Sequence, residues 1–288
     1  MAMKLAGRPV VEGMACRLAP RIDALAQAGV VPTLALVRVG DRPDDVSYER
    51  TAAKRAEALG IAVRRTVLDE FAPQEAVEAA VAAANADASV HGCLLFRPLP
   101  PFVDEARVCG LLAPEKDVDG ITLASLASVF TDGREGFPPA TAAACLEMLD
   151  HYAIPVAGKH VVVVGRSLVV GKPVAMMLLR RNASVTVCHS RTGDLPALMA
   201  AADIVVCATG RARAFGRECF RAGQVVLDVG INFDTQGNLC GDVDFAAVEP
   251  VVEAITPVPG GIGSVTTSVT MAHVVEAAER QTAARAAR

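Results

Sequence analysis

The sequence predicts an α/β fold with two domains, and three observations support this prediction. The chain has 288 residues, of which 52% are hydrophobic and 21% charged, so it holds enough apolar material for two cores. Short apolar runs alternate with helical stretches along most of the chain. A stretch rich in glycine and proline, residues 133–139, interrupts this alternation near the middle. We therefore place the domain boundary just after that stretch.

The two halves differ in how strands and helices alternate. Strands that alternate with helices form mainly parallel sheets covered on both faces, and the repetition after residue 160 is typical of a doubly wound dinucleotide-binding fold. The expected strands are residues 30–39, 61–68 and 90–96 in the first half, and 160–164, 183–188, 204–208 and 225–229 in the second. The expected helices are residues 45–59, 73–86, 141–152, 171–181, 195–202 and a closing helix that begins at residue 265.

Composition and charge exclude several classes of protein. The formal net charge is −4 without a basic stripe, which argues against nucleic acid as a partner. The N-terminus lacks the apolar core of a signal peptide, and no later run predicts a membrane span. The eight cysteines are scattered, with no CxxC pair and no histidine at zinc-site spacing, so we expect reduced thiols and no metal. A soluble, cytoplasmic protein is the expectation.

A candidate phosphate-binding turn follows the strand 160–164. Gly165, Arg166 and Ser167 come directly after that strand, and Gly171 and Pro173 open the next helix. A tight turn between a strand and a helix N-terminus presents free N–H groups and the positive end of the helix dipole to a pyrophosphate. The spacing differs from G-x-G-x-x-G because Ser167 stands where a second glycine is usual. An ordinary turn between a strand and a helix is the alternative interpretation.

The end of the next strand indicates which dinucleotide is bound. An NAD site usually has a carboxylate there to hold the ribose 2′-hydroxyl, whereas an NADP site accommodates a phosphate. Ser190 and Arg191 follow the strand, and no carboxylate appears before Asp194. These residues favour NADP as the cofactor, and a polar loop without a ligand is the alternative.

Two further glycine clusters follow later strands. Gly230 and Ile231 belong to the first cluster, and residues 257–263 form the second. Backbone without side chains can approach a flat ligand closely, although such clusters also form simple turns. We assign to the cofactor site Gly230 and Ile231, together with Thr209, Gly210 and Gly263.

Five sequence blocks together resemble the signature blocks of the methylenetetrahydrofolate dehydrogenase/cyclohydrolase family. They are residues 116–120, 165–173, 189–192, 228–232 and 257–263, in the family's order and at its spacing. The resemblance implies an N-terminal α/β catalytic domain that holds folate, a Rossmann domain that holds NADP, and an active-site cleft between them. It places the first domain at residues 1–143, completed by a C-terminal helix at 265–288, and the Rossmann domain at 144–264. It also implies a homodimer.

The resemblance assigns roles to residues of this chain. Tyr48 would stack against the folate, and Asp119 would accept hydrogen bonds from the amino edge of the pterin; both are the candidate catalytic residues. Considered without the family, Tyr48 fits equally well as a packing residue of a helix, and Asp119 as a turn residue before glycine. The remaining substrate-binding candidates are Pro98, Leu99, Pro259, Gly260 and Gly261.

Two positions depart from the family. The hydrolysis of the methenyl cation depends on a lysine four residues after the tyrosine, where this chain has Ala52, and on a glutamine where it has Phe96. Lys54 projects about 200° away from Ala52 around a helix, so it does not replace the missing lysine. Arg97 carries a charge that is a poor acid or base, because a guanidinium keeps its proton; a solvated loop residue is the simpler interpretation.

These observations predict an NADP-dependent oxidation of 5,10-methylenetetrahydrofolate to the 5,10-methenyl compound by hydride transfer, with doubtful cyclohydrolase activity. The protein must align the reacting carbon with the nicotinamide and exclude water. Two alternatives stay open: a folate- or nucleotide-binding protein without turnover, suggested by Ala52 and Phe96, and a Rossmann dehydrogenase for another small substrate.

Overall fold

The computed structural model describes residues 1–287, which divide into two compact units. Unit 1 comprises Met1–Gly13 and Thr141–Thr266, and unit 2 comprises Met14–Ala140 and the residues from Thr267 onward. Two helices, α1 (Gly7–Gln27) and α10 (Ile262–Ala286), therefore have residues in both units. The prediction of a two-domain α/β fold is confirmed.

The first thirteen residues group with a different unit from the one that the sequence pattern assigned to them. We expected them in the first domain, but strand β1 (Met3–Lys4) pairs in parallel with β11 (Ala254–Ile255) of unit 1. The backbone N–H of Leu5 extends this pairing, because it donates to the carbonyl of Ile255 at 2.9 Å. Both residues of β1 are exposed, so an apolar alternation that would predict a strand is missing here.

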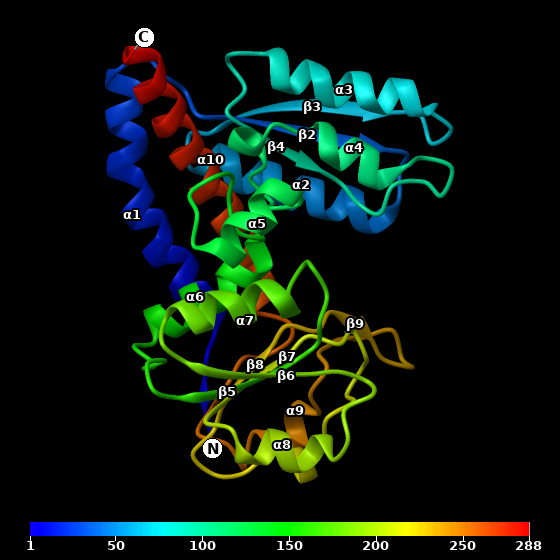
Figure 1. The fold of residues 1–288 in the computed structure, drawn as a ribbon, viewed down its shortest axis with the longest axis vertical. Coiled ribbons are helices and arrows are strands. Elements are labelled where there is room, and N and C mark those ends of the chain that lie inside the picture. The colour runs from blue at the N-terminus through cyan, green and yellow to red at the C-terminus, as the bar shows by residue number, and fades with distance from the viewer. Residues whose placement is uncertain (288) are drawn as a thin grey trace. The chain divides into compact units, whose positions relative to one another are not determined.

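Unit 2 is built on a three-stranded parallel sheet with β2 in the centre. The strand order is β3-β2-β4, with Leu36 of β2 opposite Leu94 of β4 and Arg65 of β3. Every residue of β2 is buried, which is the usual environment of a central parallel strand. One apolar cluster includes residues of α3 and α4, and the other includes residues of α1, α2 and α10. Figure 1 shows α3 and α2 on opposite faces of this sheet.

The other elements of unit 2 follow the alternation that the sequence predicts. Its strands are β2 (Thr33–Val39), β3 (Ala62–Leu68) and β4 (Gly92–Leu95). Its helices are α2 (Pro43–Ala58), α3 (Gln74–Ala86), α4 (Glu105–Leu111), the 3-10 helix η1 (Pro114–Lys116) and α5 (Leu123–Thr131).

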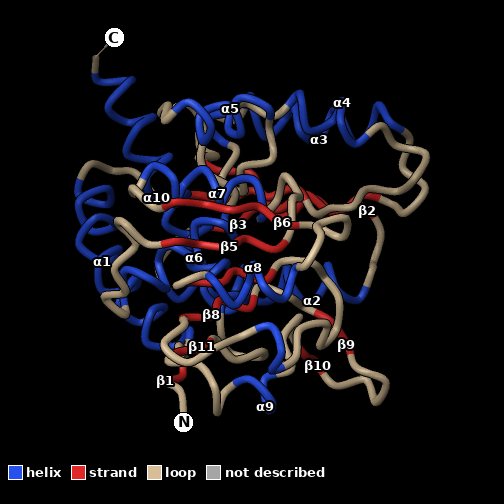
Figure 2. Tube along the Cα trace, turned by 60° about the horizontal axis from the view of Figure 1, so that its bottom comes forward, coloured by secondary structure: helices blue, strands red, loops and turns tan. Residues whose placement is uncertain are grey.

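Unit 1 is a doubly wound parallel sheet, which confirms the Rossmann prediction. Its six strands have the order β1-β11-β8-β7-β5-β6, and Figure 2 shows β6, β5, β8, β11 and β1 following one another in this order. All neighbouring pairs are parallel, so the carboxyl ends of the strands lie along one edge. The core strands are apolar because helices cover them.

The bounds of the elements in unit 1 are as follows. The strands are β5 (His160–Val164), β6 (Ser184–Cys188), β7 (Ile204–Cys207), β8 (Val225–Asp228) and a small antiparallel pair, β9 (Asn232–Phe233) and β10 (Leu239–Cys240). The helices are α6 (Ala140–His151), α7 (Gly171–Arg180), α8 (Leu195–Ala201), the 3-10 helix η2 (Arg217–Cys219) and α9 (Phe245–Val248).

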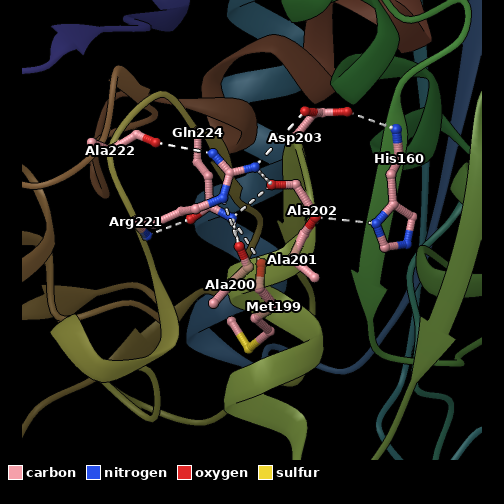
Figure 3. A network of polar contacts seen from close by, with 9 residues as sticks. All are labelled: His160, Met199, Ala200, Ala201, Ala202, Asp203, Arg221, Ala222 and Gln224. Atoms are coloured by element: carbon pink, nitrogen blue, oxygen red, sulfur yellow. Dashed lines mark hydrogen bonds and ion pairs between the residues drawn. The ribbon is translucent and has the colours of Figure 1, made fainter.

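A polar network closes the C-terminal end of α8 (Figure 3). The buried Gln224 donates from Nε2 to the carbonyls of Met199 and Ala202, both at 2.8 Å. Arg221 donates to Ala200 at 2.7 Å and to Ala202 at 2.9 Å. The last carbonyls of a helix lack partners within the helix, so these two side chains satisfy them. The network has a structural role at the amino ends of the strands.

Within residues 1–287, the structure contains no helix that is both long and apolar enough to span a bilayer.

Candidate active site

The residues assigned to the dinucleotide site lie at the carboxyl ends of parallel strands in unit 1. Residues 165–167 follow β5, residues 190 and 191 follow β6, residues 209 and 210 follow β7, and residues 230 and 231 follow β8. Ligands of open α/β sheets bind at this edge. The structure therefore brings these predicted positions to one side of one sheet.

The turn after β5 is held close to the neighbouring strand. The N–H of Gly165 donates to the carbonyl of Cys188 at 2.9 Å, and Gly165 has φ +136°, where side chains are strained. A Cβ atom on Gly165 would lie 2.3 Å from the carbonyl oxygen of Ala208. Arg166 and Ser167 are exposed, while the hydroxyl of Ser167 accepts from the N–H of Val170 at 3.1 Å.

The loop after β6 directs two side chains outward. Nδ1 of His189 accepts from the N–H of Arg191 at 3.1 Å, and the hydroxyl of Thr192 accepts from the N–H of His189 at 2.9 Å. These bonds form a compact turn in which Ser190 and Arg191 are both exposed. A hydroxyl and a guanidinium in this position suit a phosphate better than a ribose hydroxyl.

The second glycine cluster joins β11 to α10 and is tied to the chain's first helix. Pro259 and Gly260 are exposed, whereas Gly261 is buried. The N–H of Gly7 donates to the carbonyl of Gly260 at 2.7 Å. Gly263 is exposed beside Ile231, whose side chain is 64% exposed. A large apolar side chain at such exposure beside an open backbone suits contact with a ligand.

Tyr48 of α2 lies in an apolar setting within unit 2. Its ring meets Phe96 edge to face, with the centroids 5.9 Å apart and an interplanar angle of 72°. Burial raises the pKa of the Tyr48 phenol, and the charge of Asp119 raises it further. Hydrogen bonds with Thr267 and Thr270 act in the opposite direction. Tyr48 is therefore a neutral hydroxyl at physiological pH.

Asp119 is the second candidate catalytic residue, and its surroundings make ionisation costly. It is half-buried, and burial raises its pKa to about 7. The positive charge of Arg97 lowers this pKa, and the charge of Asp117 raises it. A carboxyl whose pKa lies near the working pH is common at functional sites.

The neighbours of Asp119 in the 116–120 block have structural roles. Nζ of the buried Lys116 donates to the carbonyls of Ala84, Asn85 and Asp87 at 2.7–2.9 Å. The fully buried Asp117 accepts from the N–H groups of residues 121 and 122 and from a serine hydroxyl. These contacts anchor the segment on both sides of Asp119 and fix where its backbone runs.

Apolar packing fills the positions at which the sequence departs from the family. Ala52 is fully buried and Phe96 is 5% exposed, and both belong to the same buried cluster, against which Tyr48 packs. Lys54 is exposed, as its helical position predicts. Arg97 is only partly exposed: Nη1 lies 3.5 Å from a carboxylate oxygen of Glu105, and Nε is buried without a hydrogen-bond partner among the described residues. The expectation of a solvated Arg97 is therefore wrong, because the side chain folds back onto α4.

The loop after β4 holds the two remaining substrate-binding candidates. Pro98 is exposed, and its carbonyl accepts from Nη1 of Arg42 at 2.9 Å. Leu99 is buried, and its N–H donates to a carboxylate oxygen of Glu105 at 2.8 Å. The peptide bonds before Pro98 and Pro259 are both cis. Pro98, Leu99, Tyr48 and Asp119 all belong to unit 2, whereas residues 259–261 belong to unit 1.

Two sets of residues at these sites were missing from the sequence-based assignment. Thr267 and Thr270 hydrogen-bond Tyr48, and their spacing of three on one helix was the available signal. Asp242 contacts the loops after β7 and β8. Asp242 lies more than thirty residues after the loop that follows β7. The sequence marks this position only as an acidic residue after a glycine.

Comparison with known proteins gives two matching family models. The model for the catalytic domain of tetrahydrofolate dehydrogenase/cyclohydrolase matches residues 5–119, and the model for its NAD(P)-binding domain matches residues 139–282. Together they cover most of the chain.

Individual proteins match over nearly the full length. The bifunctional protein FolD of Carboxydothermus hydrogenoformans is 48% identical over 281 residues, which are 97% of this chain and 98% of that protein. The crystal structure of the bifunctional enzyme FolD from Campylobacter jejuni has a TM-score of 0.94 at 33% identity and covers 97% of this chain and 99% of that one. FolD of Trypanosoma brucei, complexed with NADP and an inhibitor, has a TM-score of 0.92 at 32% identity and covers 98% of both chains.

Proposed function

Because the chain belongs to the tetrahydrofolate dehydrogenase/cyclohydrolase family, we propose that it oxidises 5,10-methylenetetrahydrofolate with NADP⁺ and has lost most of the cyclohydrolase activity. In this reaction a hydride leaves the carbon that bridges two folate nitrogens, and 5,10-methenyltetrahydrofolate and NADPH form. The two nitrogens stabilise the resulting cation, so the protein contributes mainly alignment and exclusion of water.

The strand-end residues of unit 1 fit NADP. The backbone of Gly165 leaves room that a side chain would close, and Ser190 and Arg191 offer an exposed hydroxyl and guanidinium where an NAD site would carry a carboxylate. We assign Gly165, Arg166, Ser167, Gly171 and Pro173 to the phosphates, and the loops at residues 209–210 and 230–231 with Gly263 to the rest of the cofactor. When bound, NADP⁺ supplies the hydride acceptor.

The residues of unit 2 fit the pterin. An ionised Asp119 accepts hydrogen bonds from paired N–H donors, and Tyr48 offers a flat, neutral ring beside it. Pro98 and Leu99 are further substrate-binding residues that we propose in unit 2, and we assign the same role to Pro259, Gly260 and Gly261 of unit 1. None of these groups needs to transfer a proton during hydride departure.

One observation carries the proposed loss of hydrolysis. Attack of water on the methenyl cation requires a group that removes a proton from that water. The family's lysine position is the buried Ala52, and its glutamine position is Phe96, which packs against Tyr48. Both positions are apolar and filled, so neither supplies a proton acceptor.

The test follows two products separately. Purified protein is mixed with methylenetetrahydrofolate and NADP⁺, and NADPH and the methenyl compound are quantified during the reaction without acid, because acid destroys NADPH and converts 10-formyltetrahydrofolate back to the methenyl compound. We expect equal amounts of both, with NAD⁺ a poorer acceptor. Separately, methenyltetrahydrofolate is supplied alone, and we expect it to disappear no faster than in buffer. Faster disappearance would show that hydrolysis survives, and no NADPH from either cofactor would favour a binding protein without turnover.

We also propose that the protein works as a homodimer in the cytoplasm. The strand β6 is at the edge of the six-stranded sheet, and its Val187 is 40% exposed; an open apolar edge favours pairing with a second copy. Seven of the eight cysteines are buried as free thiols, which fits a reducing compartment. Sedimentation equilibrium should give twice the chain mass, and Val187→Asp should lower it. A monomeric wild-type protein would contradict the dimer.

A further inference from the structure

Asp242 is a fully buried carboxylate with an unusually large set of hydrogen-bond donors. It lies in the segment between β10 and α9 of unit 1. Its Oδ2 atom accepts from the N–H of Thr209, from the Thr209 hydroxyl at 2.8 Å and from the N–H of Gly210 at 3.2 Å. Its Oδ1 atom accepts from the N–H of Arg211 at 2.9 Å and from Nδ2 of Asn232 at 3.0 Å.

Four of the five donors lie in residues 209–211 of the loop after β7, and the fifth is Asn232, the first residue of β9 at the end of the loop after β8. Thr209 and Gly210 are assigned to the cofactor site, and Asn232 directly follows the assigned Ile231. A buried carboxylate loses its hydration, and this loss is offset only when its oxygens are fully hydrogen-bonded. Five donors from these two loops meet that requirement, so the position of the carboxylate and the shape of the loops depend on each other.

The contacts also fix the direction of the peptide groups. In a trans peptide the carbonyl points opposite to the N–H, so the carbonyls of Ala208, Thr209 and Gly210 point away from Asp242. The Ala208 oxygen is the atom that a Cβ on Gly165 would meet at 2.3 Å. Asp242 therefore orients a peptide that contacts the first glycine of the phosphate turn.

A second buried carboxylate holds Asp242 in place. Oδ1 of Asp228 accepts from the N–H of Asp242 at 3.0 Å and from the N–H of Gly230 at 2.9 Å. The N–H of Phe215 donates to the carbonyl of Asp242 at 3.0 Å. A Cβ on Gly230 would lie 2.3 Å from Oδ1 of Asp242, so glycine at residue 230 is required by this carboxylate as well as by any ligand.

We propose that Asp242 is a positioning residue for the dinucleotide: it holds the loops after β7 and β8 in the conformation that binds NADP, without contacting the cofactor itself. This inference rests on the proposed function, since it presumes that NADP binds at this edge. It predicts that the loss of the carboxylate weakens NADP binding and leaves the folate residues of unit 2 unaffected.

The test compares Asp242→Asn with Asp203→Asn. An asparagine has the same shape but turns an N–H₂ group toward one of the two sets of donors, so at least two donors lose their acceptor. Asp203 is the control, because its carboxylate also accepts a backbone N–H group in unit 1, from His160 at 2.9 Å, but at the amino ends of the strands. The dissociation constant for NADP⁺ is measured by isothermal titration calorimetry on the full chain, with kcat and both KM values.

We expect Asp242→Asn to raise the dissociation constant and the KM for NADP⁺ about tenfold or more. The KM for methylenetetrahydrofolate should stay within about twofold, and Asp203→Asn should change neither value. Wild-type protein that fails to bind NADP⁺ would overturn the proposed function. Equal NADP⁺ affinity in the wild type and in Asp242→Asn would overturn only the positioning role.

A milder pair of variants keeps the test decisive if Asp242→Asn does not fold. Asn232→Leu removes the side-chain Nδ2 donor to Asp242, and the control Asn238→Leu removes an amide that donates to Asp234 and Gln236 instead. We expect weaker NADP⁺ binding for Asn232→Leu and wild-type binding for Asn238→Leu. An Asn232→Leu variant with a lower unfolding temperature and unchanged NADP⁺ affinity would assign Asp242 a purely structural role and overturn the inference.

Discussion

At the scale of single residues, the protonation of Asp119 decides when the proposed pterin site can work. Only the ionised carboxylate accepts two hydrogen bonds from N–H donors. Because burial raises its pKa to about 7, Asp119 changes its protonation state within the neutral pH range.

This predicts a pH dependence of substrate capture. kcat/KM for methylenetetrahydrofolate should rise with pH, about tenfold per unit below a pKa of about 7, and level off above it. Asp119→Asn should lower the plateau by about tenfold to a hundredfold and remove the dependence. The measurement is a series of initial rates at saturating NADP⁺, taken between about pH 5.5 and about pH 9. A wild-type profile that is flat through neutrality would contradict the role of Asp119.

Arg97 should set the midpoint of that profile. Its positive charge lowers the pKa of Asp119, and it stays charged at all working pH values. We expect Arg97→Leu to shift the midpoint of the kcat/KM profile to higher pH, because the carboxylate loses a favourable charge. Arg107→Leu removes a guanidinium that pairs with Glu78 instead, and this control should leave the midpoint in place. An unchanged midpoint in Arg97→Leu would show that the charge of Arg97 does not influence the ionisation of Asp119.

At the scale of elements, helix α2 combines Tyr48, the tyrosine proposed to bind the substrate, with a packed inner face. Ala52 and Phe96 fill the space beside Tyr48, so under the proposed function a gain of hydrolysis requires changes on α2 and directly after β4 together. A lysine at residue 52 alone would place an ammonium group in an apolar cluster, which is costly.

We therefore predict different outcomes for a single and a double variant. Ala52→Lys should lower the free energy of unfolding by about 2 kcal/mol or more, through overpacking and burial of charge. The double variant Ala52→Lys with Phe96→Gln should recover part of this loss and hydrolyse methenyltetrahydrofolate faster than buffer does. Urea unfolding and the methenyl assay measure the two effects, with Phe96→Gln alone as the control. Wild-type stability in Ala52→Lys would contradict close packing around residue 52.

Helix α8 offers a prediction about stability that is independent of function. Gln224 satisfies carbonyls at the end of α8 from a fully buried position (Figure 3). Gln224→Met keeps the length of the side chain and removes its donors, which should lower the free energy of unfolding by about 1–3 kcal/mol. Urea titration gives this value, and NADP⁺ affinity should stay the same because the network lies at the amino ends of the strands. A loss of NADP⁺ affinity would contradict this separation.

At the scale of the whole molecule, the alternation of strands and helices predicted the fold class, because parallel strands buried on both faces leave continuous apolar runs such as residues 160–164. The same signal did not find β1. Its two residues are exposed and pair with residues about 250 positions later in the chain. Pairing over such a distance depends on the assembled sheet and leaves no local pattern.

For the candidate site too, local sequence patterns predicted some residues, whereas contacts between distant segments left no pattern. Residues that follow strands were assigned from local residue types, glycine clusters and the family resemblance, and parallel strands bring such residues to one edge. Arg97 was expected in solvent, but Glu105 and the loop between them hold it against α4. The contacts of Asp242 with residues 209–211 depend on how a distant segment packs, so the spacing of residues gave no sign of them.

The state of the eight cysteines gives a prediction for the entire folded chain. Cys16 is exposed and the other seven are buried as free thiols. Burial raises the pKa of Cys93 and Cys145 to about 12 and that of Cys219 to about 11, so these groups hold almost no thiolate, which is the reactive form.

We expect one thiol of the native protein to react quickly with an aromatic disulfide reagent, and all eight to react after denaturation without any reductant. Cys16→Ser should abolish the fast phase and leave the total lower by one. Fewer than eight thiols in the denatured protein would show that a disulfide forms and would contradict the proposed reducing compartment. Several fast thiols in the native protein would mean that the cores open on the time scale of the reaction, because only opening exposes a buried thiol to the reagent.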